Sequence, residues 1–267
     1  MKSILHFSDI HFGAPHAPDR AAALLEEIER LSPSVVAVSG DLTQRARSAQ
    51  FRRARAFLDQ INAPLIVVPG NHDVPLWNVY ARFSSPLEKY RRWITPELNP
   101  TYRDDYLAVL GLDSTRSFTI KGGRIDDEDL RAVRERLRRF PEAVCKVIVT
   151  HHPLVLPPGF ERESVVSGAS RALDVFEECG VEIILTGHLH QTYITSTTPE
   201  SPRLKRSILI VQAGTAATFR GRGSEQMKNS LNLIEVSGTE IRVIGYIYST
   251  EENRFLAGIK HVSPRHV

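Results

Sequence analysis

Cysteine is scarce in this sequence: its 267 residues contain two, Cys145 and Cys179. Two thiols are too few for a disulfide framework, and they exclude a structural zinc site built from four cysteines. We interpret both as buried structural thiols. Their small number favours a reducing compartment, and we expect a cytoplasmic protein.

Long hydrophobic runs are also absent. No segment approaches the roughly 18 consecutive apolar residues that a membrane-spanning helix needs. Residues 1–9 contain one lysine, and the chain then reaches Asp9 and His11 before any sustained apolar stretch, which is unlike a secretory signal. We therefore expect no membrane span.

A strong excess of one charge is missing as well. The 34 basic and 31 acidic residues give a formal charge of +3. Since a dedicated nucleic-acid binder concentrates basic charge, we expect no such binding and favour a small anionic substrate. Arginine clusters at 45–55 and 131–139 are interleaved with apolar residues at helical spacing. A solvated helical face is the favoured interpretation of both clusters, and a phosphate-attracting surface is the alternative.

Short apolar runs rich in Val, Ile and Leu predict strands that are buried on both faces. Between them, apolar residues recur at helical spacing, and after His190 the pattern changes to successive strands. We predict an α+β fold with four layers, α/β/β/α, in which two mixed β-sheets pack face to face and helices cover their outer faces. The predicted strands are 4–7, 35–38, 65–68, 107–112, 144–149, 183–185, 207–212, 231–236 and 241–248.

No linker divides the chain, so we predict one domain over residues 1–267. Residues 77–100 contain three prolines and several arginines, and they are predicted to form an irregular insertion or cap. We expect this segment and residues 154–170 to form the walls of a substrate pocket. After Phe255 the chain is polar, and we expect its end to be poorly ordered.

Polar residues that can bind metals or carry protons follow five of the predicted strands. In open α/β sheets ligands bind at the carboxyl ends of strands, because loops converge there. Asp9 and His11 are two residues apart, so on an extended segment both would point to the same side. The five segments are SDIHFG with Asp9 and His11, SGDLT with Asp41, PGNHDVP with Asn71, His72 and Asp73, THHP with His151 and His152, and GHLHQ with His188 and His190.

Each segment alone has an ordinary structural explanation, but together they hold six of the ten histidines. Carboxylate, amide and imidazole groups suit Mn²⁺, Fe²⁺ or Zn²⁺ in catalytic sites with five or six ligands. Seven donors are more than one ion accepts once solvent has a place, so two ions that share a carboxylate fit better. These donors are Asp9, His11, Asp41, Asn71, His151, His188 and His190.

The order Asp-x-His, Gly-Asp, Gly-Asn-His-Asp, His, Gly-His-x-His is the signature of the calcineurin-like metallophosphoesterase superfamily, which the chain resembles from Asp9 to His190. Within that superfamily, the form of THHP and the uninterrupted GHLH are similar to the bacterial class III cyclic-nucleotide phosphodiesterases. The later strands agree with the second sheet of the family.

This resemblance implies a role for each matching residue. His72 would face the phosphoryl group as a catalytic residue, and Asp73 would fix the orientation of His72. His152 would either support the metal ligands or be purely structural. One ion would be held by Asp9, His11, Asp41 and His190, and the other by Asp41, Asn71, His151 and His188, with Asp41 bridging.

The resemblance also implies a metal-dependent phosphoric ester hydrolase, in which two divalent ions activate water for in-line attack on phosphorus. A small soluble phosphodiester is the expected substrate, with 3′,5′-cyclic nucleotides as the first choice. One alternative is a broad-specificity phosphodiesterase or a pyrophosphatase on nucleotide- or lipid-linked substrates, although no membrane-seeking amphipathic helix supports a lipid. Another is an inactive scaffold, which would be expected to lack ligands or His72, and all of these are present.

Overall fold

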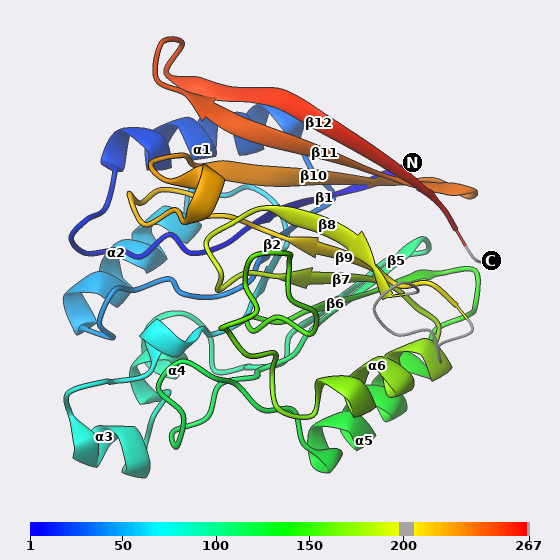
Figure 1. The fold of residues 1–267 in the computed structure, drawn as a ribbon, viewed down its shortest axis with the longest axis horizontal. Coiled ribbons are helices and arrows are strands. Elements are labelled where there is room, and N and C mark those ends of the chain that lie inside the picture. The colour runs from blue at the N-terminus through cyan, green and yellow to red at the C-terminus, as the bar shows by residue number, and fades with distance from the viewer. Residues whose placement is uncertain (198–205, 266–267) are drawn as a thin grey trace.

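The protein is built on two six-stranded β-sheets that pack face to face (Figure 1). The computed structural model describes residues 1–197 and 206–265. The first sheet consists of β1 (Lys2–Phe7), β2 (Val35–Val38), β3 (Leu65–Val67), β10 (Ser230–Val236), β11 (Glu240–Ser249) and β12 (Arg254–Pro264). The second consists of β4 (Thr101–Arg103), β5 (Leu107–Gly111), β6 (Cys145–Val149), β7 (Val181–Thr186), β8 (Tyr193–Ser196) and β9 (Leu209–Gln212).

Each sheet has a parallel part and an antiparallel part. The strand orders are β12-β11-β10-β1-β2-β3 and β4-β5-β6-β7-β9-β8. Strands β1, β2 and β3 run parallel to one another, as do β5, β6, β7 and β9. Because parallel strands share a direction, the loops that follow them gather at one edge of each sheet.

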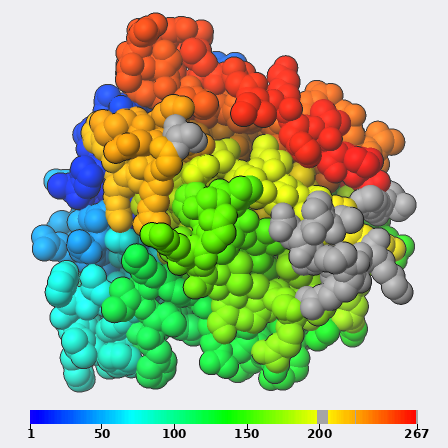
Figure 2. Space-filling view, viewed as in Figure 1, coloured from blue at the N-terminus to red at the C-terminus, as the bar shows by residue number. Residues whose placement is uncertain are grey.

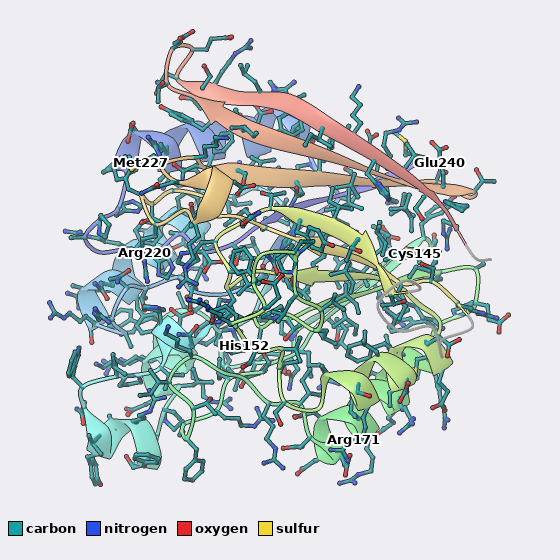
Figure 3. All side chains as sticks on the ribbon, in the orientation of Figure 1. Cys145, His152, Arg171, Arg220, Met227 and Glu240 are labelled. Atoms are coloured by element: carbon teal, nitrogen blue, oxygen red, sulfur yellow. The ribbon has the colours of Figure 1, made fainter. Side chains whose placement is uncertain are left out.

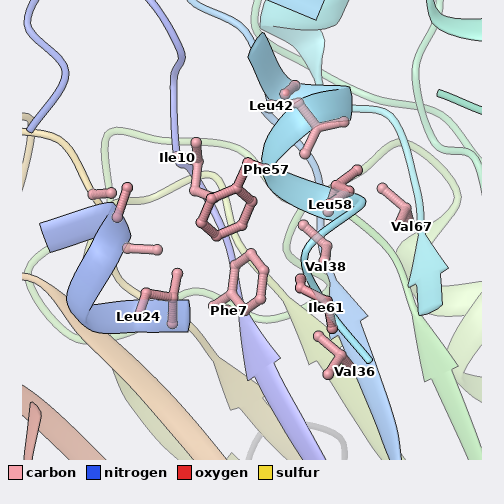
Figure 4. Close-up of a cluster of buried hydrophobic side chains, with 14 of the residues drawn as sticks. Phe7, Ile10, Leu24, Val36, Val38, Leu42, Phe57, Leu58, Ile61 and Val67 are labelled. Carbon is pink, nitrogen blue, oxygen red and sulfur yellow. The ribbon is translucent and has the colours of Figure 1, made fainter. Parts of the chain in front are cut away.

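Two pairs of helices cover the outer faces of the sheets. Helices α1 (Pro18–Leu31) and α2 (Ser48–Leu58) pack on the first sheet, where Phe7, Leu24 and Phe57 belong to one buried cluster (Figure 4). Helices α5 (Asp127–Leu137) and α6 (Ala169–Glu178) pack on the second sheet, where their apolar faces include Leu130 and Phe176.

A third apolar cluster fills the space between the sheets. It contains Ile4, Val35 and Ile66 from the first sheet, and Val147 and Ile183 from the second. The strands are therefore buried on both faces, as their unbroken apolar runs indicate. The predicted α/β/β/α layering is confirmed.

The structure corrects the prediction for the C-terminal segment. Residues 254–264, which were not among the predicted strands, form β12, and it pairs with β11 as an antiparallel edge strand. The end of the chain, expected to be poorly ordered, includes residues 266–267, which lie outside the described residues. The sequence of β12 gives no clear alternation of buried and exposed residues, because most of its side chains are exposed, while its backbone hydrogen bonds are made to β11. The short edge strands β4 and β8 were not predicted either, since three or four half-exposed residues carry little hydrophobic pattern.

Residues 77–100, predicted to form an insertion or cap, contain two short helices, α3 (Val79–Ser84) and α4 (Glu88–Trp93). Arg82 of α3 is buried and donates hydrogen bonds to the carbonyl oxygens of Pro75, Ser117 and Thr119. It thereby joins the insertion to the loop that follows β5. The short 3₁₀ helix η1 (Asn71–Asp73) follows β3, and a second one, η2 (Gly223–Glu225), precedes β10.

Replacing Phe7 tests the packing between the first sheet and its helices. Phe7 is fully buried, with its ring 6.3 Å from that of Phe57. We expect Phe7→Ala to lower the free energy of unfolding by about 3–5 kcal/mol, because it leaves a cavity in a dense core. Urea unfolding followed by circular dichroism measures this change. In the control Ile259→Ala, at a side chain that is 75% exposed, the free energy of unfolding is expected to stay within about 0.5 kcal/mol of the wild-type value. Equal losses in both variants would contradict the role of Phe7 in this core.

Candidate metal centre

All seven metal-ligand candidates lie in loops at the carboxyl ends of parallel strands. Asp9 and His11 follow β1, Asp41 follows β2, and Asn71 begins η1 directly after β3. His151 follows β6, and both His188 and His190 follow β7. The first four therefore come from one sheet and the last three from the other. The structure brings all of them together at the edge that the two sheets share.

Several of these residues have a left-handed backbone. Positive φ angles occur at Asp9 (56°), His11 (51°), Asp41 (53°), His188 (73°) and His190 (58°). The prediction that Asp9 and His11 lie on an extended segment is therefore wrong. Residues other than glycine adopt this conformation rarely, although Asp and His do so more often than most, and the strain it stores is typical of functional loops.

Asp9, His11, Asp41 and His190 form the first group of candidate ligands, with one donor atom of each within 4.8 Å of the others. His190 Nε2 lies 3.1 Å from Asp9 Oδ1 and 3.2 Å from His11 Nε2. Asp9 Oδ1 is buried and accepts no hydrogen bond. A buried carboxylate oxygen that faces imidazole nitrogens in this way fits a shared cation.

The second group consists of Asn71, His151 and His188. Asn71 Oδ1 lies 3.1 Å from His151 Nε2 and 3.0 Å from His188 Nδ1, and these two nitrogens are 3.3 Å apart. An amide oxygen and two imidazole nitrogens therefore converge on one point. This donor set suits a divalent transition metal.

Asp41 lies between the two groups. Its Oδ2 is 3.6 Å from His11 Nε2, and its Oδ1 is 3.4 Å from His151 Nε2. Each carboxylate oxygen thus faces a different group. Oδ1 also accepts a hydrogen bond of 2.8 Å from the backbone N–H of His72.

Backbone carbonyls fix two of the imidazole rings. The Nδ1 of His151 lies 2.7 Å from the carbonyl oxygen of Ser39, and the Nδ1 of His190 lies 2.8 Å from that of Arg220. A carbonyl can only accept, so each Nδ1 carries a proton, and in the neutral ring Nε2 keeps a free lone pair that can bind a metal. Both Nε2 atoms face the centre.

The electrostatics of the centre favour a bound cation. Burial lowers the pKa of His11 to about 4, and burial with the nearby His151 lowers the pKa of His188 to about 3, so neither imidazole needs to lose a proton before binding a metal at neutral pH. For His151, burial alone would lower the pKa, but the carboxylates of Asp41 and Asp9 outweigh it and raise the pKa. The carboxylates therefore attract positive charge into a buried site.

Glycine is needed where the loops come closest. A Cβ atom on Gly70 would overlap the carboxylate oxygen and the backbone nitrogen of Asp41, and it would stand 2.8 Å from Asp41 Cγ. At Gly40 a Cβ would stand 2.6 Å from the Nδ1 of His151. Any other residue at these positions would push a candidate ligand away.

The structure corrects the role predicted for Asp73. The carboxylate of Asp73 is buried and accepts hydrogen bonds from the backbone N–H groups of Gly70, Leu42 and Thr43 and from the hydroxyl of Thr43. Burial and the charge of Asp41 raise its pKa to about 7, against the effect of these bonds. Asp73 thus joins two loops and does not orient His72.

His72 is oriented by a backbone group instead. Its Nδ1 lies 2.9 Å from the carbonyl oxygen of Gln44, and its ring centroid is 4.8 Å from that of His11. His152 is buried beside the second group. Its Nδ1 is 2.8 Å from the hydroxyl of Ser114, and its ring centroid is 4.9 Å from that of His151.

Arg220 and Gln44 are site residues that the sequence reasoning missed. Arg220 Nη1 lies 2.9 Å from Gln44 Oε1 and 3.5 Å from His72 Nε2. Arg220 lies in the loop after β9, which is parallel to β7. The rule that loops converge at strand ends therefore applied to it, but no histidine or carboxylate motif marked that loop.

Comparison with known proteins agrees with this geometry. Residues 2–192 match the family described as calcineurin-like phosphoesterase. The chain belongs to the calcineurin-like phosphoesterase family. It is accordingly a metal-dependent phosphoester hydrolase, and divalent metals are typical of the family.

The curated relatives include phosphodiesterases. A probable cyclic nucleotide phosphodiesterase of Synechococcus sp. is 27% identical over 205 residues, which cover 72% of this chain and 74% of the relative. A cAMP/cGMP dual specificity phosphodiesterase of Mycobacterium tuberculosis is 29% identical over 217 residues, covering 73% of this chain and 63% of the relative. A probable glycerophosphodiester phosphodiesterase of Arcobacter nitrofigilis is 26% identical over 172 residues, covering 61% and 59%.

Solved structures show the same fold. A dimetal phosphatase from Danio rerio aligns with a TM-score of 0.67 at 10% identity, covering 99% of both chains. The purple acid phosphatase of yellow lupin aligns with a TM-score of 0.72 at 12% identity, covering 99% of this chain and 54% of that one. Across residues 1–197 and 206–265, every helix is too short or too polar to cross a membrane.

Alanine at Gly70 tests whether the close approach to Asp41 is needed for metal binding. We expect Gly70→Ala to weaken Mn²⁺ binding about tenfold or more, because the added methyl group displaces the carboxylate. Competition with a chelator measures the affinity. The matched control is Gly238→Ala, where a Cβ meets nothing within 4 Å; unchanged affinity in both variants would show that the contact is unimportant.

Proposed function

We propose that the protein is a phosphodiesterase with a binuclear metal centre. The observation that carries this proposal is the position of Asp41, whose two carboxylate oxygens face two separate groups of donors. One ion would be held by Asp9, His11, Asp41 and His190, and the other by Asp41, Asn71, His151 and His188. The donors suit Mn²⁺, Fe²⁺ or Zn²⁺. Such ions, when bound, lower the pKa of water and neutralise charge on phosphoryl oxygens.

His72 is the proposed catalytic residue. Since its Nδ1 donates to the carbonyl of Gln44, its Nε2 is directed towards Arg220 and the donor groups. In the imidazolium form both ring nitrogens of His72 carry protons, and the proton on Nε2 can pass to the oxygen of the leaving group, which would otherwise depart as an alkoxide. The ring is then left neutral, with its Nδ1 still donating to Gln44. The backbone of Gln44 keeps the ring in that orientation throughout.

The insertion is the proposed substrate cap. Asn71 Nδ2 donates a hydrogen bond of 3.3 Å to the carbonyl of Ile120, which places this exposed residue beside the second donor group. Phe118, two residues away, packs against Phe83 of α3 with 5.4 Å between ring centroids. An apolar rim thus runs from the centre to the cap, where the organic part of a phosphodiester would lie.

The favoured substrates are small soluble phosphodiesters, with 3′,5′-cyclic nucleotides as the first choice. The relatives named as cyclic nucleotide phosphodiesterases support this choice. A broader specificity is the second candidate, supported by the relative named as a glycerophosphodiester phosphodiesterase. We also infer that residues 1–267 act as one domain, and that the protein is cytoplasmic, which suits its two buried unpaired thiols.

A substrate panel tests the proposed function. The metal-free chain is reconstituted with Mn²⁺, Fe²⁺ or Zn²⁺, and its metal content is measured. We expect two ions per chain and hydrolysis of bis(p-nitrophenyl) phosphate, with cyclic nucleotides turned over faster than glycerophosphodiesters, dinucleotides or sugar nucleotides. Chelator treatment should abolish turnover. A folded chain that takes up no metal and hydrolyses nothing would refute the proposal and favour a scaffold.

Substitution of His72 separates catalysis from metal binding. We expect His72→Ala to lower kcat about a hundredfold to ten-thousandfold while both ions stay bound, because the ring handles a proton and is not a ligand. Turnover and metal content are measured on the same sample. His261→Ala, on β12, serves as the control and should retain wild-type kcat. Loss of metal from the His72 variant would mean that the residue is misassigned.

A further inference from the structure

Arg220 has a guanidinium group that forms no ion pair with any described residue, although the charges of Asp41 and Asp9 act on it from farther away. Its side chain is half-buried, and its Nη1 donates a hydrogen bond of 2.9 Å to the neutral amide oxygen of Gln44. Among residues 1–197 and 206–265, no carboxylate lies within salt-bridge distance of it, and its Nε and Nη2 atoms have no hydrogen-bond partner. Donors of this kind are available to a ligand.

The guanidinium lies against the candidate metal centre. Its Nη1 is 3.3 Å from His11 Nδ1 and 3.5 Å from His11 Nε2, so it rests against the ring and does not point at one nitrogen. It is also 3.5 Å from the Nε2 of His72. Arg220 therefore stands between a proposed metal ligand and the proposed proton donor.

The charge balance of the site calls for an anion. Asp9 and Asp41 are the only carboxylates in the proposed ligand set within the described part of the chain. Two divalent cations would leave this set positively charged, and Arg220 adds a further positive charge. A phosphoryl group bound there would be held by charge-assisted hydrogen bonds, for which the planar fork of arginine is well suited.

The side chain of Arg220 is not needed to hold its own loop. The carbonyl of Thr218 accepts a hydrogen bond of 2.8 Å from Asn229, and the ring of Phe219 packs over the guanidinium of Arg20 at 4.3 Å. The backbone N–H of Arg222 donates to the carbonyl of His190 at 3.1 Å. These contacts fix the backbone on both sides of Arg220, so its guanidinium is preorganised and free to bind.

The surface around this loop is continuous with a predicted pocket wall. Arg222 forms a 2.9 Å ion pair with Glu163, which lies in the 154–170 segment. In Figure 2 the orange loop before β10 and the green loop that contains Glu163 lie next to each other. Arg220 thus sits where two loops meet beside the centre.

We infer that Arg220 is a catalytic residue that binds the non-bridging oxygens of the phosphoryl group, and that Gln44 is its positioning residue. Gln44 performs two tasks: its side-chain oxygen holds Arg220, and its backbone carbonyl holds His72. One residue therefore sets the distance between the group that binds the phosphoryl oxygens and the group that protonates the leaving oxygen. This inference rests on the proposed phosphodiesterase function.

Binding of inorganic phosphate tests the inference without relying on turnover. The probe is inorganic phosphate, titrated by calorimetry into Mn²⁺-reconstituted protein. We expect Arg220→Gln to weaken phosphate binding about ten- to a hundredfold with unchanged metal content, because it removes charge-assisted hydrogen bonds. The phosphate affinity of Arg220→Lys should lie between those of the wild type and Arg220→Gln, since lysine keeps the positive charge but lacks the planar, two-pronged guanidinium. In the hydrolysis of bis(p-nitrophenyl) phosphate, Arg220→Gln should have a higher KM and a lower kcat than the wild type.

Two further variants make the test specific. Gln44→Ala keeps the backbone carbonyl that orients His72, so we expect a loss of phosphate affinity of about three- to tenfold from the loosened guanidinium alone. Arg171→Gln is the control for net charge: Arg171 lies on α6, away from Arg220 in Figure 3, and pairs with Asp127 on the surface. It should bind phosphate as the wild type does.

The outcomes separate this inference from the function on which it rests. If the wild type hydrolyses phosphodiesters but Arg220→Gln binds phosphate as tightly as the wild type, the role of Arg220 is refuted and the phosphodiesterase stands. An equal loss of phosphate affinity in Arg171→Gln would also refute the role of Arg220, since the net positive charge of the protein would then account for phosphate binding. If the wild type binds phosphate through Arg220 but hydrolyses nothing, the proposed function fails instead. Should Arg220→Gln lose its metals, Arg220→Lys and Gln44→Ala carry the test.

Discussion

The structure of the site depends on burying two carboxylates, Asp9 and Asp41, among imidazole nitrogens. Removing a carboxylate from water is costly unless positive charge compensates for it, and here the surrounding histidines are held with free lone pairs facing inwards. A cation satisfies both kinds of group at once. Assembling these groups strains the backbone, because five ligand candidates are left-handed and Gly70 approaches Asp41 closely. The dense apolar core between the sheets stabilises the fold against this strain.

Much of the fold could be predicted because continuous apolar runs identify strands that are buried on both faces. The position of the site followed from the same pattern, since polar residues after parallel strands must meet at one edge. Edge strands such as β12 were not predicted because most of their side chains are exposed to solvent and so carry little hydrophobic pattern. They pair with the sheet through backbone hydrogen bonds, which do not depend on residue type. Sequence order gave a wrong prediction for Asp73: it follows His72 directly, yet its carboxylate accepts hydrogen bonds from the backbone of its own loop at Gly70 and of the loop after β2 at Leu42 and Thr43.

Residues without a distinctive motif were the hardest to foresee. Gln44 acts partly through its main-chain carbonyl, which no residue type encodes, and Arg220 contributes a carbonyl to the His190 ring as well as a guanidinium to the site. Gln44 directly follows the SGDLT segment, whereas Arg220 lies beyond β9 and outside every motif that identifies the family. Such residues can differ between relatives that share every metal ligand, and they are therefore where differences in substrate choice can arise.

Each donor group takes members from both sheets: His190 joins the Asp9 group, and Asn71 joins His151 and His188. Neither group can be complete until the two sheets have packed face to face. Thermodynamic linkage then makes the concentration of free divalent ions a variable of the folding equilibrium, because ions bind the assembled sandwich and not its separated halves. Ions held at this centre would thus stabilise the folded chain in addition to supporting its activity.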